Sequence, residues 1–265
     1  MTKKIDESRY IFGGVSDEVG GPKPNEDYFI FKVLDADTLF IAVADGMGSK
    51  PSTLQPAAIV CVKAAETIER LFKANSEVFL ENPDMMLTEA VHVANNVVGA
   101  FKISNEEQHA GFAASMVCVL ICGGDKFCFS HVGNCRINLI RTQEDGSSKI
   151  LQVTIDHTQA MELLSGGIIT QDEFNTHPDR FVLKSSIGVI NDPDIQQYKG
   201  KLKKNDILLI TTDGVHYNIR PEPMAQIVLQ ANNWEDATAG LIQGARLEKA
   251  GDNATAVLFI NSNRQ

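Results

Sequence analysis

Four short acidic motifs stand where an apolar run of this sequence meets a polar turn, and carboxylates in such places can bind metal ions. Asp45-Gly46 and Asp213-Gly214 each directly follow an apolar run, whereas Asn25-Glu26-Asp27 and Gly251-Asp252-Asn253 each directly precede one. The glycine after an aspartate permits positive φ and lets its own carbonyl oxygen approach a ligand closely. These motifs are therefore candidate metal ligands.

Convergence of the four motifs in space would create a site for divalent cations. Like charges that lie close together cannot all stay ionised unless cations neutralise them. Ligation by carboxylates, a backbone carbonyl and water suits the hard ions Mg²⁺ and Mn²⁺. Spacing along the chain does not show convergence, and an Asp-Gly pair after a strand is also an ordinary turn. At this point a metal site and a set of unrelated turns are both open.

The elements that would position these motifs begin with a hairpin and two helices. Tyr28–Val33 and Leu39–Ala44 are β-rich runs separated by the turn-like Asp35-Ala36-Asp37, which predicts a hairpin. Apolar residues then recur at helical spacing over 54–72 and 87–101, which predicts two amphipathic helices. Each helix has one apolar stripe to bury, so we expect both to lie on a sheet.

Strands are expected again in the middle of the chain. Ala113–Cys122, Lys126–Val132 and Arg136–Arg141 are apolar, β-rich runs. They are joined by Gly123-Gly124-Asp125 and Gly133-Asn134, and this turn chemistry predicts an antiparallel meander of all three strands.

The last part of the chain reads as a polar segment followed by strands and helices. Residues 156–180 predict a loop with short helical pieces. We expect a buried strand at Ile207–Thr212, helices at Pro223–Gln230 and Glu235–Lys249, and a final strand at Ala254–Ile260. Strands grouped with helix pairs, rather than strictly alternating with helices, predict an α+β layered fold. No linker-like stretch divides the chain, so we expect one domain over residues 1–265.

Composition limits the partners and the compartment. The chain of 265 residues has a formal net charge of −10, which argues against binding to nucleic acid or to an anionic membrane. No signal peptide and no apolar run of membrane-spanning length is seen. The five cysteines are odd in number and lie in apolar segments, which predicts free thiols in a reducing compartment. We therefore expect a cytoplasmic protein.

Taken in order, these motifs resemble those of the metal-dependent phosphatases of the protein phosphatase 2C family, from about Ser16 to Ile260. The segments that carry the resemblance are Asn25-Glu26-Asp27, Ala44–Gly48, His131–Arg136, Thr154–Thr158, Thr212-Asp213-Gly214 and Asp252–Thr255. Residues 166–180 are similar to the flap of bacterial members, and we place a flap at about 160–185. The resemblance implies a four-layer α-β-β-α sandwich of two antiparallel sheets flanked by helix pairs.

The resemblance also implies a ligand set for two Mn²⁺ or Mg²⁺ ions. In this set Asp45 bridges the ions, the Gly46 carbonyl binds one of them, Asp213 and Asp252 complete the pair, and Asp27 and more distantly Glu26 hold metal-bound water. A water acidified by both ions would attack phosphorus in line, while the ions offset charge on the phosphoryl oxygens. The aspartates at 45, 213 and 252 are thus the expected catalytic residues, without a protein nucleophile.

One histidine is a candidate for proton transfer. His157 follows Asp156 in a segment that lies near the catalytic cleft in relatives, and it could act as a general acid toward the leaving oxygen. A histidine in a loop is more often structural or solvated. Both interpretations stay open on the sequence alone.

The sequence departs from the family pattern in three places that bear on activity. One is the loop Gly48–Ser52 after Asp45, which lacks the usual second glycine and the acidic helix start. The family usually has an arginine three residues before Asn25 that grips the substrate phosphate, and here that position is Pro22. Lys23 could supply a charge to the phosphate but not the fork geometry of arginine. Asn134 stands where bacterial relatives carry the aspartate of a third metal, so we expect a third ion to be weak or absent.

Three functions are compatible with these observations. The leading hypothesis is a Mn²⁺- or Mg²⁺-dependent phosphoserine/phosphothreonine protein phosphatase that opposes a protein kinase. The second is a catalytically weak or inactive phosphatase-fold module that binds phosphoproteins or regulatory partners, which the missing arginine favours and the retained aspartates disfavour. The third is a phosphatase of small phosphorylated metabolites.

Overall fold

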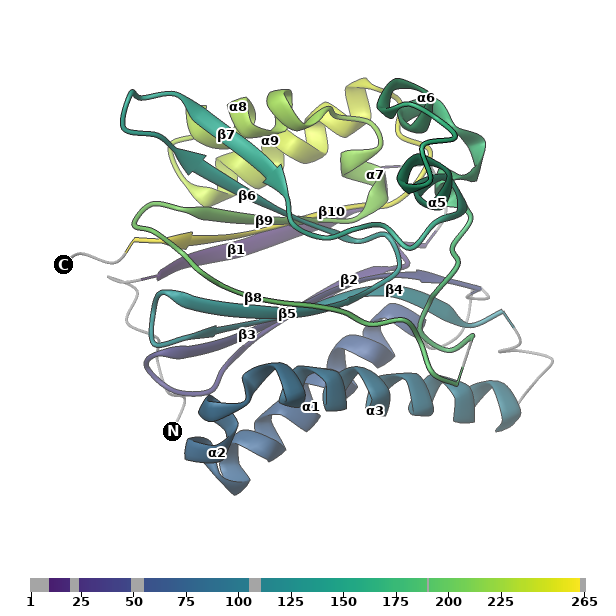
Figure 1. The fold of residues 1–265 in the computed structure, drawn as a ribbon, viewed down its shortest axis with the longest axis vertical. Helices are drawn as coiled ribbons and strands as arrows, with labels where there is room; N and C mark the ends of the chain where they lie inside the picture. Colours follow the sequence, from purple (N-terminus) through teal and green to yellow (C-terminus); the bar gives the residue numbers. More distant parts are fainter. Residues whose placement is uncertain (1–9, 20–23, 49–54, 105–110, 190, 263–265) are drawn as a thin grey trace.

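Two five-stranded antiparallel sheets face each other in a computed structural model, which describes residues 10–19, 24–48, 55–104, 111–189 and 191–262 (Figure 1). In order across the first sheet, the strands are β1 (Tyr10–Asp17), β10 (Ala254–Asn261), β9 (Ile207–Thr211), β6 (Arg136–Thr142) and β7 (Ser148–Gln152). Across the second sheet they are β2 (Asp27–Val33), β3 (Thr38–Met47), β4 (Ala113–Cys122), β5 (Lys126–Val132) and β8 (Gln196–Lys201).

Helices cover the outer face of each sheet (Figure 1). The second sheet carries α1 (Pro56–Ala74) and α3 (Pro83–Ser104), with the short α2 (Ser76–Glu81) between them. The first sheet carries α8 (Pro221–Gln230) and α9 (Trp234–Leu247). The two sheets and their two helix layers form the four-layer sandwich that the sequence resemblance implies.

Apolar side chains fill all three spaces between these layers. Between the sheets, Val43 and Val117 of one sheet belong to the same buried cluster as Ile210 of the other. A second cluster lies under α1 and α3, and a third lies under α8 and α9. A strand with helices on one face and a second sheet on the other is apolar throughout, which is why every residue of β4 is buried.

The predicted hairpin and helices are present, with one difference that matters for the site. β2 and β3 pair as expected, but β3 continues to Met47 instead of ending at Ala44. Asp45 is therefore inside the ladder and pairs with Asp27 rather than following the strand. An aspartate is uncommon inside a strand, so the composition rule placed the boundary too early.

The predicted meander is correct for β4 and β5 and wrong for the third strand. β6 lies in the opposite sheet beside β9, so Gly133-Asn134 is a crossing between sheets and not a hairpin turn. Ser115 Oγ accepts hydrogen bonds from the backbone N–H groups of Asn134 (2.9 Å) and Cys135 (2.7 Å), which fixes this crossing. Gly133 has φ +102° and its absent Cβ would lie 2.6 Å from Ser115, so only glycine fits there.

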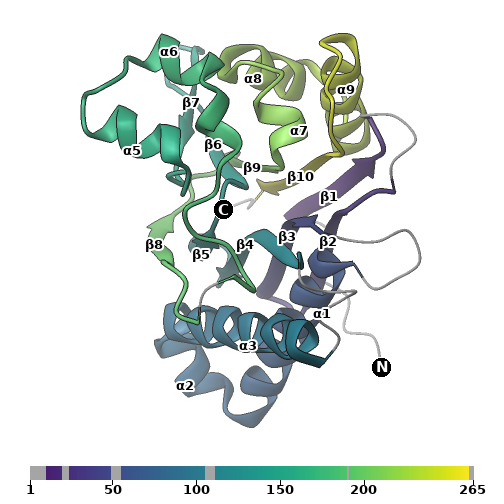
Figure 2. The same ribbon diagram turned by 90° about the vertical axis from the view of Figure 1, so that its right-hand side faces the viewer.

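The polar segment after β7 forms short helices, as its composition predicts, and this is the segment that the resemblance places in a flap. It contains α5 (Gln159–Ser165), α6 (Gln171–Thr176) and the 3₁₀ helix η1 (Pro178–Phe181). The flap lies at the same end of the sandwich as the one-turn helix α7 (Asp213–His216), as both views show (Figures 1 and 2).

Two findings bear on the environment of the protein. All five cysteines are buried and free, which agrees with the expected thiols. Within the described parts of the chain, no helix combines the length and the apolar character needed to cross a membrane.

Candidate metal centre

Asp27 and Asp45 face each other across the ladder between β2 and β3. Their Cα atoms are partners in the antiparallel register, and the next residue, Gly46, donates its backbone N–H to the Glu26 carbonyl oxygen at 3.1 Å. A Cβ on Gly46 would lie 2.8 Å from that oxygen and 3.1 Å from the Ala57 backbone nitrogen. The backbone at the base of the site is thus packed too closely for any other residue.

The first sheet contributes Asp213 and Asp252. Asp213 is the first residue of α7, one position beyond Thr212 and the end of β9, and Asp252 lies just before β10. The two segments touch through backbone atoms, because a Cβ on Gly214 would lie 2.0 Å from the Asn253 carbonyl oxygen. The glycine of the Asp-Gly motif is therefore required for contact between the two aspartate segments.

Hydrogen bonds join the two sheets directly at the site. Asp27 Oδ2 accepts the hydroxyl groups of Thr212 and Thr255, each at 2.7 Å, and both threonines belong to the opposite sheet or its edge. The side chain and the backbone of Asn253 have different partners at the site. Its Oδ1 accepts the Glu26 backbone N–H at 2.9 Å, while its backbone N–H donates to Asp252 Oδ1 at 2.9 Å.

The carboxyl groups lie within reach of one another's charges. Burial raises the pKa of Asp27 to about 7, although the hydroxyl groups of Thr212 and Thr255 act in the other direction. Burial, followed by the charge of Asp213, raises the pKa of Asp45 well above its usual value. Burial and the charge of Asp252 raise the pKa of Asp213 to about 6. The structure thus brings the four predicted aspartates to one place.

This donor set suits hard divalent cations. Buried carboxyls whose ionised forms repel one another are stabilised as anions when a cation lies between them. In the described chain, no three His, Cys, Asp or Glu side chains already form a site that could hold one ion unaided. The arrangement expected from the sequence requires fewer protein ligands per ion, because Asp45 is shared and Mg²⁺ keeps several waters. The residues present fit two ions on that basis.

Asn134 contacts the site as a neutral donor. It is buried, and its Nδ2 donates to Asp213 Oδ2 at 3.2 Å. This hydrogen bond lowers the pKa of Asp213 and so partly offsets the effect of burial. The amide oxygen of Asn134 is neutral and so a weaker ligand for a hard cation than a carboxylate, and the weakness of a third ion stays a prediction.

His157 lines a hollow beside the flap. Its Nδ1 accepts the Gly133 backbone N–H at 3.3 Å, and its ring lies 4.9 Å from that of His131. Burial lowers its pKa, and the charges that act on it are those of Asp194 and Asp156. A largely neutral imidazole with one nitrogen engaged by backbone favours the structural interpretation over the general acid. Lys23, the candidate for the substrate phosphate, lies outside the described residues, as does Pro22.

Sequence reasoning missed a buried ion pair behind the site. Arg136 forms a bidentate contact with Asp156, with Nε–Oδ1 at 2.8 Å and Nη2–Oδ2 at 2.6 Å. The Tyr217 hydroxyl also lies 3.2 Å from Asp156 Oδ2 and 2.7 Å from the Arg180 carbonyl oxygen of the flap. Arg136 and Asp156 both fall in motifs noted in the sequence, but nothing there shows that two segments 20 residues apart pair with each other.

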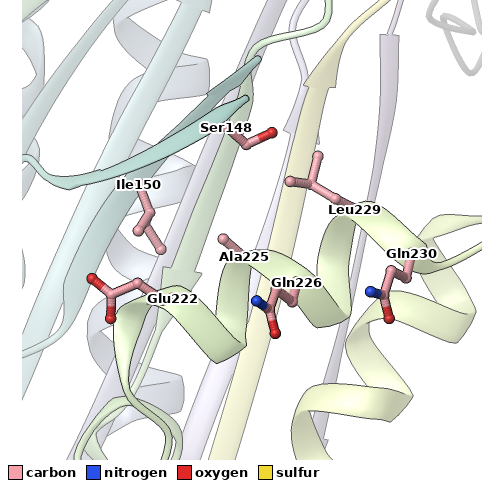
Figure 3. Close-up of a pocket in the computed structure, with 7 residues that line it drawn as sticks. All are labelled: Ser148, Ile150, Glu222, Ala225, Gln226, Leu229 and Gln230. Atoms are coloured by element: carbon pink, nitrogen blue, oxygen red, sulfur yellow. The ribbon is translucent and has the colours of Figure 1, made fainter. Parts of the chain in front are cut away.

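Two surface hollows differ in their relation to this centre. A groove of about 380 Å³ lies between β7 and α8 (Figure 3). Glu222 is the one ionisable residue in its lining, and none of the site aspartates reaches it. A hollow of about 570 Å³ lies beside the flap instead, lined in part by His157, Glu162 and Lys184. Asp156 also lines the hollow beside the flap.

A four-layer sandwich with buried carboxyls at the junction of its sheets is the arrangement that the resemblance to metal-dependent phosphatases implies. The sequence model described as "Protein phosphatase 2C" matches residues 18–243. The chain belongs to the protein phosphatase 2C family. This membership confirms the predicted family and the predicted class of enzyme, a protein phosphatase.

Relatives and solved structures agree with this assignment. Protein phosphatase PhpP of Streptococcus pneumoniae serotype 2 (strain D39) is 26% identical over 237 residues, covering 88% of this chain and 90% of the relative. The structure of phosphatase Stp1 from Staphylococcus aureus matches with a TM-score of 0.81 at 21% identity, covering 94% of each chain. The catalytic domain of PstP in complex with two manganese ions matches with a TM-score of 0.75 at 21% identity, covering 95% of this chain and 98% of that one.

Proposed function

We propose that this chain hydrolyses phosphoserine and phosphothreonine esters in proteins, with two Mn²⁺ or Mg²⁺ ions at the aspartate centre. Asp45, Asp213 and Asp252 would hold the ions with the Gly46 carbonyl oxygen, and Asp27 and Glu26 would hold their waters. The observation that supports this best is that aspartates from opposite sheets lie within one another's electric field. A binding module that recognised only phosphate would not require such a set.

The residues around the centre prepare it for this chemistry. Bound divalent ions supply Lewis-acid stabilisation of negative charge on a phosphoryl group and make bound water more acidic. Thr212 and Thr255 fix the orientation of the Asp27 carboxylate through their hydroxyl groups. Asn134 holds Asp213 in the same way. Side chains oriented in advance need little rearrangement during reaction, which lowers the barrier.

The proposed setting is the cytoplasm, with a phosphorylated protein as substrate and a protein kinase as the opposing enzyme. The net charge of −10 and the five buried, free cysteines support this setting. Residues 1–265 would act as one phosphatase domain, with the flap at about 160–185 facing the substrate. Neither nucleic acid nor a membrane surface is expected as a partner, since both attract basic proteins.

Hydrolysis of an aryl phosphate tests the proposal. We expect wild-type protein to be active with Mn²⁺, inactive with a chelator, and slowed by about a hundredfold or more in Asp213→Asn, because Lewis-acid stabilisation is worth several kcal/mol and each 1.36 kcal/mol is tenfold in rate. Asp236→Asn, an exposed position on α9, is the matched control and should leave the rate unchanged.

Two outcomes would redirect the assignment. Folded, Mn²⁺-loaded protein that hydrolyses neither aryl phosphate nor phosphopeptides would favour a phosphoprotein-binding module. Activity on aryl phosphate without activity on phosphoserine peptides would favour a metabolite phosphatase.

A further inference from the structure

This chain lacks the arginine that usually binds the substrate phosphate in the family. The position three residues before Asn25, where the family resemblance leads one to expect an arginine, is Pro22. A phosphate ester that reaches the metal centre still carries negative charge, which a guanidinium binds with two parallel hydrogen bonds. Another guanidinium at the edge of the site could bind this charge.

Arg180 in η1 of the flap is held beside the metal centre. Its guanidinium carbon lies 4.8 Å from the centroid of the Tyr217 ring, and the Tyr217 hydroxyl donates to the Arg180 carbonyl oxygen at 2.7 Å. Tyr217 immediately follows α7, the helix that begins with Asp213. Figure 2 shows the flap helices and α7 on the same side of the molecule. Tyr217 thus attaches Arg180 to the element that carries a proposed metal ligand.

The charges of two arginines act on Asp213, and their partners differ. Arg136 forms an ion pair with Asp156, which accepts hydrogen bonds from its Nε and Nη2. Arg180 has no carboxylate within ion-pair distance among the described residues. Its Nη1 donates to the Asn175 carbonyl oxygen, and its Nε is buried without an acceptor.

Arg180 is half-buried, and its Nε is the guanidinium nitrogen that has no acceptor. More than about nine in ten buried polar groups in proteins have a hydrogen-bond partner, and an orphan donor lowers stability. An acceptor that arrives with the substrate removes this penalty only in the complex. A phosphoryl oxygen is an acceptor of the right charge and geometry for a guanidinium.

We propose that Arg180 binds the phosphate group of the substrate, in place of the arginine that is absent at position 22. This inference rests on the proposed phosphatase activity and adds a phosphate-binding residue to it. The flap would then be part of the phosphate site itself, and not only a surface for the rest of the substrate.

Inhibition by inorganic phosphate, together with aryl phosphate kinetics, tests this role in the Mn²⁺-loaded protein. Charge-assisted hydrogen bonds lost in Arg180→Gln should raise both KM and the inhibition constant for inorganic phosphate by about tenfold or more, with a smaller effect on kcat. Arg180→Lys keeps a positive charge but not the planar guanidinium, so its KM and inhibition constant should lie between those of wild type and Arg180→Gln. Arg70→Gln, an exposed position on α1, is the control and should match wild type.

The results separate the possible roles of Arg180. If wild-type protein is active and both Arg180 variants keep its inhibition constant for inorganic phosphate, the proposal is overturned. This holds also if the variants lose thermal stability, because Arg180 would then only hold the flap on Tyr217. A wild type without hydrolysis would contradict the proposed function instead. Calorimetric titration of inorganic phosphate into the Mn²⁺-loaded proteins would still decide on Arg180, since weaker binding in Arg180→Gln supports it and equal binding refutes it.

Discussion

Asp27 illustrates how the site keeps a buried carboxyl in place. It receives hydroxyl donors from Thr255, which lies in β10 of the opposite sheet, and from Thr212, which directly follows β9. These donors stabilise the anion, yet burial still dominates and holds its pKa at about 7. A carboxyl with this pKa is half protonated near neutral pH, and a nearby cation would stabilise its ionised form. Its titration can therefore be followed by experiment.

Asp27→Asn should change how stability depends on pH when metal is removed. Between the ordinary carboxyl pKa of 3.8 and the folded-state value of about 7, the folded protein retains a proton that the unfolded chain has released. The free energy of unfolding contributed by this group therefore falls as pH rises through that window. In urea unfolding with a chelator present, the variant should lose less stability than wild type between about pH 4 and about pH 7. Identical pH profiles for the two proteins would contradict the burial argument.

At the same scale, the sequence identified the acids but not the groups that hold them. The aspartates stand out in the sequence because each lies beside an apolar run. Three of the four are also directly adjacent to a glycine. The contact of Thr212 with Asp27 spans 185 residues, and no local pattern encodes such a distance. The same reason hid the pairing of Arg136 with Asp156 and the position of Arg180 on Tyr217.

Among the elements, the backbone contact between α7 and the segment before β10 sets the spacing of Asp213 and Asp252. Gly214 makes this contact possible, since any side chain there would overlap the Asn253 carbonyl. Gly251 lies in the same segment, and a Cβ on it would meet nothing within 4 Å. The two glycines are thus a matched pair for experiment.

Gly214→Ala should therefore weaken both folding and metal binding. Overpacking of this kind costs about 1–3 kcal/mol, and the displaced aspartates should bind Mn²⁺ less tightly. Gly251→Ala should leave both properties close to wild type. Urea unfolding and a calorimetric Mn²⁺ titration measure the two effects. If both variants kept wild-type Mn²⁺ affinity, the contact would have no part in positioning the site.

Elements with a strong apolar pattern were the ones that could be predicted. The stripes of α1 and α3 and the uninterrupted apolar run of β4 follow from burial. The edge strand β8 reads Gln-Gln-Tyr-Lys-Gly-Lys and carries no such pattern, so nothing marked it as a strand. β6 was assigned to the wrong sheet because glycine and asparagine after a strand permit both a hairpin and a crossing.

For the whole molecule, the packing of two sheets creates the site. Asp27 and Asp45 belong to one sheet and Asp213 and Asp252 to segments that flank the other. No single sheet holds the full set. Local sequence patterns predicted layers and candidate ligands, whereas the way the sheets face each other depends on long-range packing. The family resemblance supplied that arrangement, and the structure has it.

The most direct measurement is anomalous diffraction at the manganese absorption edge from crystals grown with Mn²⁺. We predict two anomalous peaks beside the Asp45 carboxylate, about 3.5–4 Å apart as in other two-metal sites, one nearer Asp213 or Asp252 and both absent in Asp45→Asn. Crystals of wild-type protein without manganese between the two sheets at saturating Mn²⁺ would contradict the account.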